Sequence, residues 1–327
     1  MSRRVGVLLP LALFFAGNAG AEEVGLWQRV RDPGAVMRNR ARLRAEQLFD
    51  QASSARGDLE ILRELSLGSA ALLELSGGAR RDPWQAVLLG RVLLDAEVGR
   101  ERAAIQLIES GLPALPPSDF KRASWFDVGL GAMVSGDMEH ATRAFSAALL
   151  LAWDPDDRAT IHRNRGKANM LLGRLSDAVA DFRAAVRLAR GVEVLALSHI
   201  GLGVALERSG DYPQGIQEVA RGVAVRLPVP PYPSESVLDS LSLRWIPEYD
   251  VHYFRALAKM AEALAADSSA SRRDHFEAAL ENLDQYLPPA EAARDRFVPN
   301  AMRLQQRCVD ALAAAREPPA LRSGRVR

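Results

Sequence analysis

The sequence predicts an all-α protein: a solenoid of stacked antiparallel helical hairpins, capped by a C-terminal helix. A polar-then-apolar decapeptide occurs three times, beginning at Gly136, Gly173 and Gly210, at intervals of 37 residues (173 − 136 and 210 − 173). Aromatic residues make up only 6% of the chain while Ala and Leu are abundant, which favours helices over sheets. One hairpin cannot bury its apolar face alone, but identical neighbours can do so by stacking.

Each repeat reads as a helix with an internal glycine, a glycine turn, and a second helix with small, large and small residues. The internal glycines are Gly129, Gly166 and Gly203. The small and large residues that follow are Ala141 and Phe145, Ala178 and Phe182, and Gly215 and Val219. Glycine inside a helix costs about 1 kcal/mol relative to alanine. We therefore expect each internal glycine to lie against the small residue of its partner helix, and the large residue to fill the gap to the next hairpin.

These residues resemble the tetratricopeptide repeat, which has an aromatic residue, a Leu-Gly pair, small, aromatic and small residues, and a late proline. The stretch "WFDVGLGAMVSGDMEHATRAFSAALLLAWDP" is similar to that motif through Trp125, Gly129, Ala141, Phe145, Ala148 and Pro155. The second and third repeats have His162 and His199 in place of the first aromatic residue, so we expect packing or interhelical roles for these histidines. The interval of 37 exceeds the usual repeat of about 34 residues.

The chain divides into six predicted segments. Residues 1–21 are a signal peptide, 22–117 degenerate helical repeats, 118–228 three tetratricopeptide repeats, 229–236 a proline-rich connector, 237–316 a helical hairpin with its cap, and 317–327 a disordered tail. The signal consists of Arg3 and Arg4, an apolar run and the small residues Ala19 and Ala21. It predicts a periplasmic or secreted protein, and no cysteine follows the apolar run as a lipoprotein would require.

The sequence contains no recognisable catalytic or metal-binding motif. Ser118 and Lys121 match S-x-x-K, a pattern that arises often by chance, and its companion K-T-G is missing. Cys308, the single cysteine, lies on the apolar face of a predicted helix and is interpreted as a buried, inert thiol. A net charge of +1 argues against nucleic-acid binding through a basic field. We expect no enzyme, cofactor or metal, although a hydrolase with an unrecognised site stays an alternative.

The resemblance implies a groove lined by the first helix of each repeat. Its partner-binding residues would be Phe126, Leu130, Met133, Arg163, Asn164, Lys167 and Met170. Arg163 and Lys167 are four residues apart, so their charges share a helix face. Only Asn164 matches the pattern that family members use to clamp chaperone tails, which disfavours that class of partner.

A second candidate surface is the arginine-rich start of the mature chain. Arg38, Arg40, Arg42 and Arg44 occupy one predicted helix. Such a helix could contact anionic lipid or cell-wall carboxylates, or it could be a capping helix with a charged outer face.

The function predicted from these features is a non-enzymatic scaffold that binds envelope proteins in the periplasm of a Gram-negative cell. The assembly would serve secretion, polysaccharide export, motility or outer-membrane biogenesis. The alternative is a module that binds peptidoglycan or another carbohydrate through the arginine-rich surface.

Overall fold

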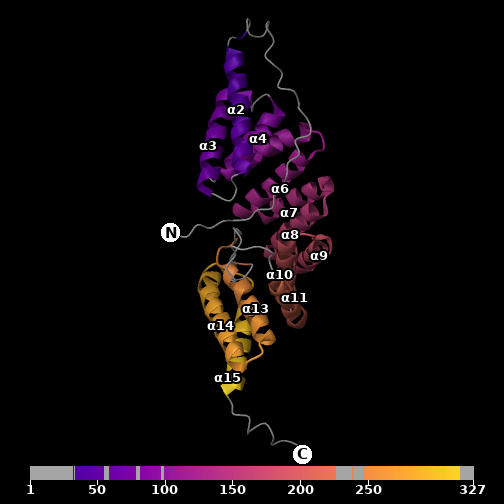
Figure 1. The fold of residues 1–327 in the computed structure, drawn as a ribbon, viewed down its shortest axis with the longest axis vertical. Helices are drawn as coiled ribbons and strands as arrows, with labels where there is room; N and C mark the ends of the chain where they lie inside the picture. The colour runs from indigo at the N-terminus through magenta and orange to yellow at the C-terminus, as the bar shows by residue number, and fades with distance from the viewer. Residues whose placement is uncertain are drawn as a thin grey trace, which may run out of the picture. The chain divides into compact units, whose positions relative to one another are not determined.

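The computed structural model describes residues 32, 34–54, 59–78, 82–96, 99–225, 238 and 246–316. The predicted signal peptide, the connector 229–236 and the tail 317–327 lie outside this range. The described chain forms two compact units, divided after Trp153. Each unit consists of successive helices joined by short connections (Figure 1).

Unit 1 contains three helix pairs: α2 (Gly34–Ser54) with α3 (Leu59–Ser76), α4 (Pro83–Asp95) with α5 (Glu101–Gly111), and α6 (Asp119–Val134) with α7 (Met138–Leu151). A short 3-10 helix, Leu112–Ala114, follows α5. Unit 2 contains α8 (Pro155–Leu171) with α9 (Leu175–Leu188), α10 (Val192–Arg208) with α11 (Tyr212–Ala224), and α13 (Asp250–Ala265) with α14 (Ser269–Ala292), followed by α15 (Val298–Arg316). Every regular element in the described residues is helical, and consecutive helices pack as antiparallel pairs. The predicted all-α, tetratricopeptide-like fold class is confirmed.

The three repeated glycines form the turns inside the pairs α6–α7, α8–α9 and α10–α11. Gly136, Gly173 and Gly210 have φ values of 80°, 79° and 100°, a region that side chains with a Cβ rarely occupy. In each turn the residue after the glycine donates its backbone N–H to a carbonyl five residues earlier, as for Asp137 to Ala132 at 2.9 Å. The carboxylates of Asp137 and Asp211 then cap the following helix by accepting N–H bonds, at 2.9 Å from His140 and 3.1 Å from Gln214. In these two turns, the glycine and the aspartate that follows it therefore end one helix and start the next.

The internal glycines allow close helix packing, but their neighbours differ from the prediction in two repeats. A Cβ at Gly129 would lie 2.4 Å from the ring of Phe145, and one at Gly166 would lie 3.2 Å from the ring of Phe182. In these two pairs the glycine accommodates the large residue of its own pair rather than Ala141 or Ala178. Phe182 also lies against Gly201 of the next hairpin, so its predicted role between hairpins is confirmed.

The third pair shows the predicted contact of small residue with small residue. A Cβ at Gly203 would lie 2.5 Å from the carbonyl oxygen of Gly215, and one at Gly215 would lie 2.7 Å from the carbonyl oxygen of Gly203. Because Val219 is smaller than phenylalanine, the two backbones approach more closely here. The pair α4–α5 packs in the same way, since a Cβ at Gly90 would lie 2.6 Å from the carbonyl oxygen of Ala104.

Helix α14 extends further than its sequence predicts. Pro288 and Pro289 predict that the helix ends at Leu287, whereas the observed helix continues to Ala292. A proline removes one backbone donor from a helix, but this loss falls in the last turns, where few helical bonds remain to be made. Tyr286 and Ala290 are fully buried on either side of the prolines, and their packing supports the extra turn.

A buried charge pair connects α13 to α10 within unit 2. The guanidinium of Arg208, at the end of α10, donates to the carboxylate of Asp250, the first residue of α13. Both side chains are almost completely buried. The rings of Tyr253 and Phe297 lie 4.4 and 4.1 Å from the guanidinium. Removing one partner of such a pair would leave an uncompensated buried charge, so we expect the loss of either side chain to destabilise unit 2 strongly.

Candidate functional site

The apolar half of the predicted groove lies on α6, in unit 1. Phe126 is half-buried and packs on Phe145 with ring centroids 5.6 Å apart. Leu130 is 37% exposed, but Met133 is only 2% exposed and belongs to the core. Val134, which was not among the predicted groove residues, is 37% exposed. The accessible apolar stripe of α6 is therefore Phe126, Leu130 and Val134, at intervals of four residues.

The polar half of the predicted groove lies on α8, in unit 2. Arg163, Asn164 and Lys167 are all partly exposed, and we call them the α8 basic patch. The side-chain amide of Asn164 donates to the backbone carbonyl of Thr160 at 2.8 Å, which leaves its amide oxygen available as an acceptor. Met170 is fully buried in the core of unit 2. The binding role of the seven residues stays a prediction, and the burial of both methionines shows that a partner could not reach them directly.

The two cations of the α8 basic patch are only partly hydrated. Burial lowers the pKa of Arg163, and the nearby carboxylate of Glu193 on α10 partly opposes this effect. Burial also lowers the pKa of Lys167 to about 8; Asp250 opposes the decrease, while Arg163 and Arg208 contribute to it. The pKa of Glu193 is in turn raised by its own burial. A carboxylate bound at this patch would favour the protonated form of Lys167 and compensate for the missing solvation.

The other face of α8 is occupied by a structural charge cluster. His162 Nδ1 lies 2.9 Å from a carboxylate oxygen of Asp181 on α9, and Arg165 and Asn169 donate to the same carboxylate at 2.7 and 3.0 Å. Burial raises the pKa of Asp181, but the hydrogen bonds from His162 and Arg165 outweigh it and the net pKa is lowered. The next repeat has the equivalent contact, with His199 Nδ1 2.7 Å from Glu218. The predicted interhelical role of both histidines is confirmed.

Residues that could suggest chemistry have structural roles in this fold. The hydroxyl of Ser118 accepts from the backbone N–H of Lys121 at 3.2 Å and caps α6, while the amine of Lys121 donates to the carbonyl of Leu115 at 2.8 Å. Cys308 is fully buried, and burial raises its pKa to about 12, so its thiol is inert as predicted. Within the described ranges, no three His, Cys, Asp or Glu side chains are placed to hold a metal ion.

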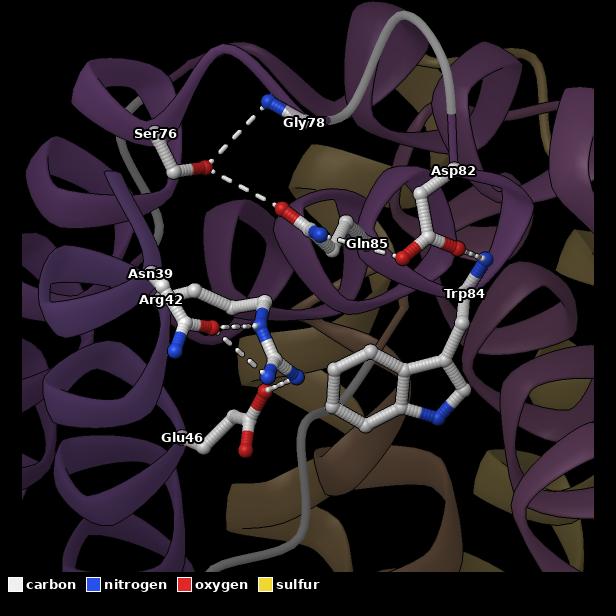
Figure 2. A network of polar contacts seen from close by, with 8 residues as sticks. All are labelled: Asn39, Arg42, Glu46, Ser76, Gly78, Asp82, Trp84 and Gln85. Atoms are coloured by element: carbon white, nitrogen blue, oxygen red, sulfur yellow. Dashed lines mark hydrogen bonds and ion pairs between the residues drawn. The ribbon is translucent and has the colours of Figure 1, made fainter. Parts of the chain in front are cut away.

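The arginine-rich helix α2 is partly neutralised by its own residues (Figure 2). Arg42 donates to Glu46 at 2.7 Å and to Asn39 at 3.0 Å. Arg38 pairs with Asp32, and Arg44 donates to Gln47 at 3.1 Å. Figure 2 also shows how α3 leads into α4: the Ser76 hydroxyl donates to Gln85 at 3.1 Å, and Gln85 donates to the capping residue Asp82 at 3.0 Å. These contacts favour the capping-helix interpretation of α2 over a surface of free guanidinium groups.

Among the described helices, none is both long enough and apolar enough to cross a membrane.

Comparisons with known proteins add a distant structural likeness. No protein-family model matches the chain. No curated protein matches it either. A solved structure that is similar to it is the crystal structure of the APC/C hetero-tetramer Cut9-Hcn1, with 12% sequence identity and a TM-score of 0.42. The match covers 85% of this chain and 56% of that chain, so the present chain spans little more than half of its length.

Proposed function

We propose that the chain is a non-enzymatic scaffold, exported to a bacterial envelope, and that the α8 basic patch binds an acidic segment of a protein partner. The observation behind this proposal is the pair of incompletely hydrated cations, Arg163 and Lys167, side by side on a partly exposed face. The stacked helix pairs support it, because such stacks present extended surfaces to partners. The apolar stripe of α6 is proposed as a separate contact surface, since an interface needs apolar anchors as well as charge.

The first test concerns the α8 basic patch. The double variant Arg163→Glu/Lys167→Glu should bring down less of an envelope partner than the wild-type chain, because reversed charges repel an acidic segment. The difference should shrink as salt is raised, since salt screens partly exposed charges. The matched control is Arg102→Glu/Arg143→Glu, with the same change in net charge on exposed residues of unit 1. If both variants recover the same amount of partner while circular dichroism shows intact helices, the α8 basic patch does not bind the partner.

The second test concerns export. If residues 1–21 are a cleaved signal, the mature protein begins at Glu22 and is found in the periplasmic or secreted fraction. N-terminal sequencing of fractionated protein measures this directly. An intact Met1 on protein in the cytosol would contradict the proposed location and the envelope role that depends on it.

A further inference from the structure

Helix α9 has an exposed basic stripe that the fold itself does not use. Arg183 and Arg187 are four residues apart on the helix, and Arg190 follows three residues later, just past its end. All three are exposed, and no side-chain ion pair to them occurs among the described residues. We call these three residues the α9 basic stripe.

The stripe belongs to one repeat only. At the positions 37 residues earlier and later, Arg183 corresponds to Ser146 and Ala220, and Arg187 corresponds to Leu150 and Ala224. A cation near a helix C-terminus interacts favourably with the helix dipole, but that effect is confined to the last turn and does not account for Arg183. The three arginines therefore point to a role beyond stabilising the repeat.

Helix α14, also in unit 2, has an acidic stripe with the same spacing. Glu277 and Glu281 are four residues apart and Asp284 follows three residues later, and all three are exposed. Their spacing places them on one helix face. Glu277 lies 3.8 Å from the guanidinium of Arg273, and Asp284 accepts from Gln305 at 2.8 Å. We call these three residues the α14 acidic stripe.

We propose that the two stripes bind one another between copies of this chain, so that α9 of one molecule lies against α14 of the next. Arg183 and Arg187 on α9, and Glu277 and Glu281 on α14, are each separated by four residues, which is about 6 Å along a helix axis. In the view of Figure 1, α10 and α13 lie between α9 and α14 within unit 2. Helices α9 and α14 are not among the helices that pack together extensively in the described part of the chain. A contact between two different surfaces repeats head to tail, and it gives a closed ring or an open chain of molecules according to the rotation between successive copies.

The association should be weak and sensitive to salt. Exposed ion pairs contribute little individually, and charged surfaces mainly accelerate encounter. Screening shortens the range of these interactions from about 30 Å at 0.01 M salt to about 3 Å at 1 M. Self-association should therefore be measured at high protein concentration in low salt.

Sedimentation velocity on the full chain and three variants tests the proposal. The wild-type sedimentation coefficient should rise with protein concentration in about 0.01 M salt, where the screening length is about 30 Å, and stay constant in about 1 M salt. Both Arg183→Glu/Arg187→Glu/Arg190→Glu and Glu277→Arg/Glu281→Arg/Asp284→Arg should stay monomeric alone. An equimolar mixture of the two should associate again, because each supplies the charge that the other lacks. The control Arg63→Glu/Arg102→Glu/Arg143→Glu changes three exposed arginines of unit 1 and should behave as wild type.

Several results would overturn the proposal. The contact is excluded if the wild-type chain stays monomeric in low salt at high concentration. It is also excluded if the two reversed variants fail to associate when mixed, provided that circular dichroism shows each of them to be helical. Loss of association in the control would show that net charge, rather than the two stripes, is responsible. If a triple variant does not fold, the single variants Arg183→Glu and Glu281→Arg replace it, and their mixture must associate more than either alone.

Discussion

Lys167 is the residue whose environment departs most clearly from that of an ordinary surface lysine. Burial removes water from its amine, and the positive charges of Arg163 and Arg208 add to this effect, while Asp250 opposes it. The result is a pKa of about 8. Near neutral pH the amine is thus protonated, and a bound anion would favour this form further.

The first prediction follows from this lowered pKa. The ordinary pKa of lysine is about 10.4. Between pH 8 and that value, the unfolded chain binds a proton at Lys167 that the folded chain has lost. Lys167 therefore makes the free energy of unfolding rise with pH in that window. Below pH 8 both states are protonated, and the folded state bears the cost of a buried charge. Lys167→Met should therefore raise the free energy of unfolding at pH 7, by at most about 3 kcal/mol, and by less at pH 9.5.

Chemical denaturation of wild type and variant at the two pH values provides the measurement. Lys259→Met is the matched control, because Lys259 is a partly exposed lysine paired with Glu262 at 2.8 Å. An equal difference between Lys167→Met and wild type at pH 7 and pH 9.5 would contradict the assigned pKa.

For individual residues, the sequence predicted that a side chain makes an interhelical contact, but it did not predict which residue that side chain contacts. The substitution of aromatic residues by His162 and His199 indicated interhelical roles, but Asp181 and Glu218 could be identified only once the register of each helix pair was known. The groove residues show a different limit. A rotation of α6 by a fraction of a turn exchanges Met133 for Val134 at the surface, and sequence spacing alone does not determine that rotation.

At the scale of helices, the pairs are specified by short-range features that the sequence displays directly. The glycine turns were predicted because they depend only on neighbouring residues, and the same is true of the capping aspartates, which directly follow two of these glycines. The residues that lie against Gly129 and Gly166 were predicted wrongly, because they depend on the distance between helices, which the phenylalanine rings determine. The extension of α14 through its prolines likewise depends on tertiary packing of Tyr286 and Ala290.

The second prediction compares two glycines at the same repeat position. Gly203→Ala places a methyl group 2.5 Å from a backbone oxygen that cannot move without separating α10 from α11, so we expect a loss of about 1–3 kcal/mol. Gly166→Ala places it 3.2 Å from the ring of Phe182, which can shift slightly, and a gain of about 1 kcal/mol in helix propensity offsets the crowding. Thermal melting should therefore show a clearly lower midpoint for Gly203→Ala and little change for Gly166→Ala. Equal midpoints would show that the backbones of α10 and α11 are not in close contact.

At the scale of the whole molecule, each unit has its own helix pairs and its own candidate surface. Unit 1 provides the apolar stripe of α6, and unit 2 provides the α8 basic patch. In unit 2 the buried pair of Arg208 and Asp250 also connects the repeat helices to α13. The fold class was predictable because the repeat interval, the composition and the spacing of small and large residues all indicate stacked helix pairs.

Site-specific photo-crosslinking from position 164 in intact cells tests the central claim most directly. Asn164 is replaced by a photoreactive phenylalanine, and the same substitution at Arg143, exposed on α7, serves as the control. The proposed function predicts an adduct at position 164 whose added mass is removed by protease. The adduct from position 143 should be weaker. The adduct from position 164 should also be weaker when Arg163→Glu is introduced. An adduct removed by a muramidase instead of a protease, or equal adducts from both positions, would contradict a scaffold that binds protein partners through the α8 basic patch.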